Sequence, residues 1–172
     1  TSGNRDIGND MLIDAKNLCV DYIASDGGLG RLFSNCHYLT HAPKIWGGVG
    51  RMSKSFQSCN RLTHAPKVLD STLTEDQFYF AFDNCTALKA VQIGNVTYAP
   101  TNDPDDFNCT FQTNNSLCYM KCMFDPSTLH NDFTEFSKNV SANGVFVKKV
   151  GSTWPTGDTG IPSGWTVLEA TE

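Results

Sequence analysis

The chain has 172 residues, of which 40% are hydrophobic and 11% aromatic, and its formal net charge at pH 7 is −5. This length suits one domain that buries about 70% of the surface of its unfolded chain, so folding needs no metal or disulfide. The negative charge and the scattered basic residues argue against nucleic acid as a partner, and no apolar run approaches the ~18 residues of a membrane span.

The N-terminal segment 1–28 contains "DMLIDAKNLCVDYI", which we expect to seal one end of the fold. Because the first residue is Thr1, we expect the printed chain to be a processed product, an excised domain or part of something longer. Its seven cysteines are odd in number and mostly follow a repeat, so we do not interpret them as a disulfide framework. A bridge between Cys109 and Cys118 stays open at this point.

Two segments of the next region are nearly identical: "FSNCHYLTHAPK", residues 33–44, and "FQSCNRLTHAPK", residues 56–67. Further copies start at Phe82, Phe111 and Phe136, so successive copies are 23, 26, 29 and 25 residues apart. A period in the twenties is typical of leucine-rich repeats, in which each turn has one strand and one short helix.

A column of small side chains lies three residues after the first Phe of each copy. Cys and Asn both suit a buried turn, because Cys tolerates apolar surroundings and Asn can bind the backbone of the neighbouring turn. We therefore interpret this column as a structural ladder rather than a set of metal ligands or nucleophiles. Its members are Cys36, Cys59, Cys85, Asn114 and Asn139.

We call the position of the first Phe in each copy phase zero. Short helices are expected before this Phe, because an apolar residue lies four positions earlier. These residues are Leu29, Met52, Phe78 and Phe107; in the last copy Asp132 breaks the column, although Phe133 can serve. Two start signals agree with helices, namely a capping box formed by Thr74 and Gln77 and the pair Asp103–Pro104.

Strands are expected nine to eleven residues after each Phe, where buried residues alternate with exposed ones. The inward pairs are Val91 and Ile93, Met120 and Cys122, and Val145 and Val147. The first two copies have Pro43 and Pro66 there, so their strands should be short or irregular.

Together these patterns predict an α/β solenoid that is leucine-rich-repeat-like, with about five helix–strand turns, a parallel β-sheet and end caps. Residues 1–172 form one domain in this prediction, with a cap over 1–28, repeats over 29–147 and a second cap over 148–172. Trp154 and Trp165 would cover the core at the C-terminal end.

The unit "F-x-x-C-x-x-L-T-x-A-P" and the ending "TGDTGIPSGWTV" resemble the BspA-type leucine-rich repeat proteins of gut Bacteroidales and their phages. The resemblance covers roughly residues 29–168 and implies an extracellular or surface-displayed protein with a role in adhesion or ligand binding. Copies four and five depart from the unit, since Asn replaces Cys and "LTxAP" is lost. A shared ligand is therefore not implied.

No motif of catalysis is present, so we predict no enzyme, no catalytic residues, no cofactor and no metal site. His41 and His64 share a column and could in principle hold a metal ion together, but no third ligand column accompanies them, and two solvated side chains explain them better. The acidic run 102–106 lacks the ligand spacing of a calcium loop and fits a capped helix start.

The outward positions of stacked strands should form a binding face, because side chains of successive turns line up in rows. We predict a non-enzymatic module that binds a protein or carbohydrate ligand at a cell surface. The alternative is a structural component of a surface assembly or of a virion, such as a phage tail fibre or decoration domain, which would oligomerise. The predicted face comprises Thr40, His41, Thr63, His64, Lys89, Gln92, Tyr119, Lys121 and Phe146.

Overall fold

The computed structural model describes residues 11–20, 29–45, 51–66, 71–73, 78–98, 106–129 and 133–171. Its regular elements are eight short strands and two 3₁₀-helices. They are β1 (Cys19–Val20), β2 (Lys44–Ile45), β3 (Ser71–Leu73), β4 (Ala90–Ile93), β5 (Val96–Tyr98), β6 (Tyr119–Cys122), η1 (Pro126–Thr128), β7 (Val145–Lys149), η2 (Gly157–Thr159) and β8 (Thr166–Ala170).

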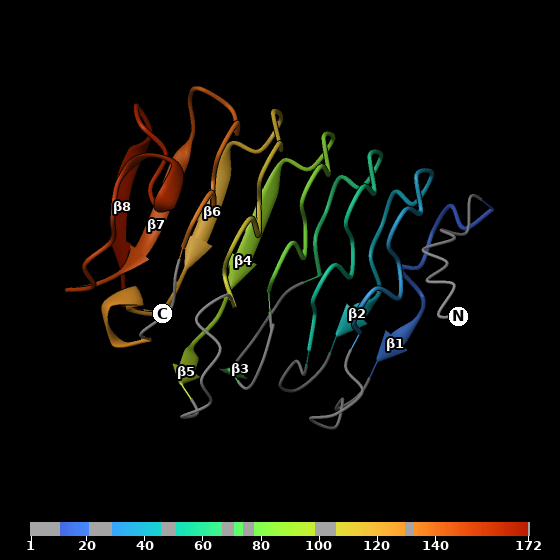
Figure 1. Cartoon of the computed structure of the whole chain (residues 1–172), viewed down its shortest axis with the longest axis horizontal. Coiled ribbons are helices and arrows are strands. Elements are labelled where there is room, and N and C mark those ends of the chain that lie inside the picture. Colours follow the sequence, from blue (N-terminus) through green and yellow to red (C-terminus); the bar gives the residue numbers. More distant parts are fainter. Residues whose placement is uncertain are drawn as a thin grey trace, which may run out of the picture.

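Successive turns of the chain lie side by side in sequence order, from the N-terminal end to β8 (Figure 1). The largest sheet has four parallel strands in the order β4-β6-β7-β8. Isolated parallel bridges join Asp14 to His41, His41 to His64 and His64 to Ala90, so the pairing continues from β4 toward the N-terminal end. Two smaller parallel pairs, β1–β2 and β3–β5, lie beside it.

The predicted α/β solenoid of helix–strand turns is wrong. The described residues contain no α-helix, and the two 3₁₀-helices have three residues each. Instead of a helix, each repeat has a run of tight turns, seen as the narrow loops along one edge of Figure 1. The regular structure is mainly the four-stranded parallel sheet.

The backbone explains why no helix forms before each Phe. Residues with positive φ occur in pairs four apart, and an α-helix requires negative φ throughout. Between the two residues of a pair, successive N–H groups donate alternately within the turn and to the next turn. The N–H of Ser55 donates to the carbonyl of Met52 in its own turn, whereas the N–H of Phe56 donates to the carbonyl of Ala81 in the next turn. Hydrogen bonds between turns thus replace those of a helix. The pairs are Arg31 and Asn35, Lys54 and Ser58, Phe80 and Asn84, Cys109 and Thr113, and Glu135 and Asn139.

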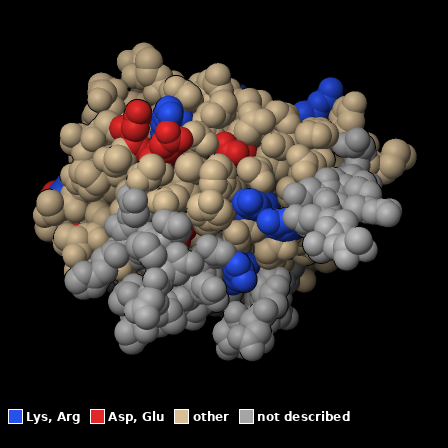
Figure 2. All heavy atoms as spheres, viewed as in Figure 1, with Lys and Arg blue, Asp and Glu red and all other residues tan. Residues whose placement is uncertain are grey.

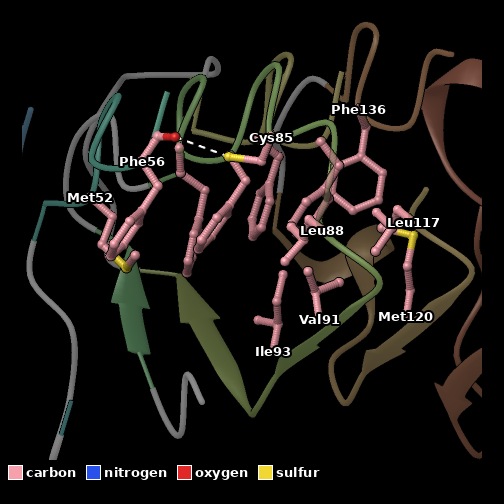
Figure 3. Close-up of a cluster of buried hydrophobic side chains, with 14 of the residues drawn as sticks. Met52, Phe56, Cys85, Leu88, Val91, Ile93, Leu117, Met120 and Phe136 are labelled. Atoms are coloured by element: carbon pink, nitrogen blue, oxygen red, sulfur yellow. Dashed lines mark hydrogen bonds between the residues drawn. The ribbon is translucent and has the colours of Figure 1, made fainter. Parts of the chain in front are cut away.

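The residues of the expected helical stripe are nevertheless buried. Leu29, Met52, Phe78 and Phe107 all belong to the core. Beside them, the first Phe residues of copies one to four form a stack, with ring centroids 5.1 Å apart for Phe33 and Phe56, whereas Phe136 of the fifth copy meets Phe111 edge-on. Figure 3 shows this continuous file of aromatic and aliphatic side chains. Turn-to-turn stacking of identical residue types therefore builds the core.

The fifth copy is displaced by one residue from its expected phase. The N–H of Phe82 donates to the carbonyl of Thr110, the residue just before the first Phe of the next copy. The N–H of Phe111 donates in the same way to the carbonyl of Phe136. The position of the first Phe is therefore taken in the fifth copy by Ser137 and not by Phe136. A one-residue slip moves every strand side chain to the other face. Val145 therefore pairs with Tyr119, and Phe146 pairs with Met120.

Three residue assignments are wrong for this reason. Val145, predicted as an inward residue, is half-buried and lies in register with the exposed Tyr119. Phe146, predicted on the outer face, is completely buried and contacts Trp154 edge-on. Asn139, predicted in the buried ladder, is exposed with a φ of 58°, and Val140 packs against the core in its place.

The prolines of the first two copies have the predicted effect, because only isolated bridges form at His41 and His64. At the C-terminal end, Trp154 packs against Phe124, Phe133 and Phe136, and β8 adds a further parallel strand beyond β7. The expected helix starts at Thr74–Gln77 and Asp103–Pro104 lie outside the described residues. Of the acidic run 102–106, only Asp106 is described, and it is buried.

Candidate ligand-binding face

Parallel pairing places one residue from each turn in a single transverse row, which we call the strand-start row because it contains the first residues of β4, β6, β7 and β8. Neighbouring strands are ~4.8 Å apart, so adjacent members of the row lie within contact distance of the same ligand. The row comprises Asp14, His41, His64, Ala90, Tyr119, Val145 and Thr166.

The two histidines of the row stack on one another. Their ring centroids are 5.9 Å apart and their planes differ by 2°. Asp14 extends the row on one side, with its Oδ1 3.8 Å from His41 Nδ1. Hydrogen bonds from the backbone and side chain of Lys16 hold the pKa of Asp14 below its usual value, so this carboxylate is charged at neutral pH.

A threonine fixes the orientation of each imidazole. Thr63 Oγ1 donates to the carbonyl of Thr40 at 3.1 Å and lies 3.0 Å from His64 Nδ1. A hydroxyl has one proton, which here goes to the carbonyl, so Nδ1 must be the donor in the second contact. Thr40 and His41 repeat the arrangement with the carbonyl of Ile13. The Nε2 atom of each neutral imidazole is therefore left as a hydrogen-bond acceptor.

This geometry does not suit a metal ion shared by the two histidines. Because the rings are parallel and each Nδ1 contacts the preceding threonine at the same distance, the two Nε2 lone pairs point in the same direction rather than toward a common point, and a zinc–nitrogen bond is only about 2.0–2.1 Å long. Within the described ranges, no group of three or more His, Cys, Asp or Glu could hold a metal ion. Two parallel acceptors suit a ligand that carries hydroxyl or amide donors.

The other predicted face residues lie around the strand-start row. Tyr119 is in the row itself and is 38% exposed, and Lys89 is exposed one residue before Ala90. Gln92 and Lys121 are half-buried and pair with each other in the sheet two positions further along. These residues thus lie on neighbouring turns, and Phe146, on β7 beside β6, differs from them in being buried.

Four ladder residues form a buried file. The thiols of Cys59 and Cys85 donate to the carbonyls of Phe33 and Phe56, each at 3.0 Å, and Asn114 Nδ2 donates to the carbonyl of Phe82 at 2.9 Å. Cys thus hydrogen-bonds the preceding turn as Asn does, in addition to tolerating burial.

Burial, together with the neighbouring Cys36, raises the pKa of Cys59 to about 12, and burial also raises the pKa values of Cys85 and Cys122. These thiols remain protonated at neutral pH, which suits a hydrogen-bond donor and not a nucleophile. No disulfide joins Cys109 to Cys118.

Sequence reasoning missed Asp14 and a polar cleft lined by Asp125 and Lys149. Asp14 lies outside the repeat, so its place beside His41 had no periodic signal. The cleft joins segments that are distant in sequence, and only the fold brings them together.

Charged side chains are sparse on the face shown in Figure 2, where acidic side chains gather in one area with a basic side chain beside them. Several basic side chains lie close together in a second area, near the lower middle of the same view. Helices long and apolar enough to cross a membrane do not occur in the described segments. Comparisons of the chain with protein-family models, with curated proteins and with solved structures found no match.

Proposed function

We propose that this chain is a non-enzymatic binding module that recognises a protein or carbohydrate ligand through the strand-start row. The observation that carries the proposal is the registered arrangement of Asp14, His41, His64 and Tyr119 in one row of parallel bridges and strand pairs, in which Ala90 separates His64 from Tyr119. Fixed imidazole acceptors, a charged carboxylate and an exposed phenol provide hydrogen bonds and a stacking surface in one line.

The resemblance to BspA-type leucine-rich repeat proteins supports an extracellular or cell-surface location and a role in adhesion. We expect no cofactor for this function, because recognition needs only the side chains of the row. The ladder of Cys59, Cys85 and Asn114 joins successive turns by hydrogen bonds and so keeps them in register.

A glycan array followed by titration of the best ligand tests this function. His64→Ala and Tyr119→Ala should each weaken binding by about tenfold, while Tm stays nearly unchanged because both side chains are exposed. Asn143→Ala, an exposed substitution outside the row, is the matched control. Equal affinity of the row variants and the control would contradict the proposal, and a ligand found only on a protein array would identify the protein alternative.

The second candidate is a structural component of a surface assembly or virion. The specific observation is that β8 ends the four-stranded sheet with two exposed apolar side chains, Val167 at 43% and Leu168 at 50%. Open, apolar edge strands favour association with another chain. Light scattering of the purified chain should then show an oligomer that Leu168→Lys dissociates, whereas a monomer at high concentration favours the binding module.

A further inference from the structure

A polar cleft of about 620 Å³ lies at the opposite ends of the strands from the strand-start row. The row contains the first residues of β4, β6 and β7, whereas the cleft is formed by β5, by the segment after β6 and by the end of β7. It is therefore separate from the face proposed above. It is lined by Asn95, Val96, Thr97, Asp125, Thr128, Lys149, Val150, Gly151 and Ser152.

Asp125 has one occupied and one unoccupied carboxylate oxygen. Its Oδ1 accepts three hydrogen bonds, from the Ser127 N–H at 3.0 Å, the Ser127 hydroxyl at 2.8 Å and the Thr153 N–H at 3.3 Å. Within the described part of the chain, Oδ2 has no hydrogen-bond partner. The carboxylate is thus held in place by Ser127 and Thr153, with one oxygen left for a ligand.

Partial burial opposes the charged form of Asp125, but the hydrogen bonds from Ser127 and Thr153 and the nearby charge of Lys149 outweigh it and lower the pKa of this carboxyl. The group is therefore an acceptor at neutral pH.

Lys149 brings a positive charge to the same cleft. It is the last residue of β7, and among the described residues it forms no ion pair with Asp125. A ligand atom can therefore lie between a carboxylate acceptor and an ammonium donor. The two opposite charges disfavour both a cation and an anion as the occupant, because each would meet one group of its own sign.

Neutral hydroxyls match this pair, since each hydroxyl is both a donor and an acceptor. The exposed Asn95 adds an amide, and Val150, 52% exposed, adds an apolar surface for the C–H groups of a ring. We propose that this cleft binds the vicinal hydroxyls of a saccharide, with Asp125 Oδ2 accepting from one hydroxyl and Lys149 Nζ donating to its neighbour. The proposal goes beyond the ligand-binding face and does not depend on it.

The test is a titration of the ¹⁵N-labelled chain with glucose, galactose, mannose and N-acetylglucosamine, followed by amide NMR shifts. We expect at least one sugar to give saturable shifts in residues 95–97, 125–128 and 149–152, with a Kd on the order of 1–10 mM, as for a small ligand with few contacts. Glycine and acetate are probes for charged alternatives.

Asp125→Asn is the decisive variant, because it keeps an Oδ1 acceptor for Ser127 and replaces only the free oxygen with a donor. It should weaken sugar binding by more than about tenfold, as should Lys149→Gln. Tyr119→Ala, in the strand-start row, should leave the titration unchanged, which distinguishes this site from the proposed face.

Absence of shifts with all four sugars at about 50 mM, some five times the weakest expected Kd, would overturn the proposal. The same conclusion follows if Asp125→Asn and Lys149→Gln bind the sugar as well as the original chain, or if glycine or acetate occupies the cleft more tightly than any sugar.

Discussion

The thiol of Cys85 donates a hydrogen bond to the main-chain carbonyl of Phe56, one turn earlier, over an Sγ–O distance of 3.0 Å. Figure 3 shows this bond crossing between neighbouring turns above the stacked phenyl rings. Asn114 makes the same bond to Phe82 with its amide, so one position of the repeat satisfies one backbone carbonyl with two different donors.

This equivalence predicts how Asn114 responds to substitution. Asn114→Ala should lower the free energy of unfolding by about 2–4 kcal/mol, because it removes the donor and leaves a cavity. Asn114→Cys should cost less by at least ~1 kcal/mol, since it keeps a donor and removes Oδ1, which is buried with no hydrogen-bond partner among the described residues. Urea unfolding measures both, with Asn143→Ala as control. A larger loss for Cys than for Ala would contradict the shared role of the ladder.

Thiol reactivity should separate the seven cysteines into two groups. Cys19 and Cys118 are exposed, whereas the other five are buried. With Ellman's reagent at pH 8, we expect two thiols to react quickly and the rest only after unfolding, because a reaction needs an accessible thiolate. Mass spectrometry of the labelled peptides identifies the reactive residues. Rapid labelling of Cys59 in the folded chain would be inconsistent with its raised pKa and burial.

Thr113 offers a test of the left-handed turn positions. Its φ is 60°, which is costly for a β-branched residue, whereas Asn adopts this region more readily. Thr113→Asn should therefore stabilise the chain by about 0.5–1 kcal/mol. Thr166→Asn, at the start of β8, should give no gain. Thermal unfolding of the two variants compares them directly, and a lower Tm for Thr113→Asn would count against the backbone conformation.

The threonine–histidine contacts predict the tautomers of His41 and His64. At a pH where both imidazoles are neutral, long-range ¹H–¹⁵N NMR spectra should show the proton on Nδ1 in both rings. Thr63→Val, which keeps the shape and removes the hydroxyl, should abolish this preference in His64 while His41 keeps it. Protonated Nε2 in the original chain would remove the proposed row of acceptors.

Asp83 should make stability depend on pH in a defined direction. Burial raises its pKa, and a hydrogen bond from Gln57 only partly opposes this. Because the pKa of Asp83 is higher in the folded state than in the unfolded state, its protonated form contributes its full stability at pH values below the unfolded-state pKa. This stability is lost as the pH rises through the folded-state pKa. Asp83→Asn should thus raise Tm at pH 7, and the gain should shrink as pH falls toward 4. A gain that grows on acidification would contradict the assignment.

The repeat predicted which residues of copies one to four are buried, because the side chains of Cys59, Leu62 and Phe56 recur at fixed phase. It did not predict the backbone that buries them. Apolar residues four positions apart fit a helix, but they also fit a run of turns whose N–H groups bind the next turn. Only the hydrogen bonds between turns distinguish the two structures.

The displaced fifth copy did have a signal in the sequence. Phe133, not Asp132, continues the column of Leu29 and Met52, and this alone places phase zero at Ser137. The aromatic ring of Phe136 favoured the wrong phase. The parts of the two proposed sites that lie outside the repeat, Asp14 and Asp125, could not be predicted, because their neighbours are set by the three-dimensional arrangement.

The phenyl rings of Phe33, Phe56 and Phe82 are 5.1 and 5.3 Å apart, although 23 residues separate the first two and 26 the second two. In each of the first four copies the row residue follows its Phe by the same eight positions, from Phe33 to His41 up to Phe111 to Tyr119. All variation in copy length is therefore confined to the stretch that leaves one strand and returns to the next Phe. That stretch ends in buried core residues four positions before each Phe, namely Met52, Phe78 and Phe107, so a tag or an epitope that leaves the spacing of the rungs unchanged has to be inserted before them.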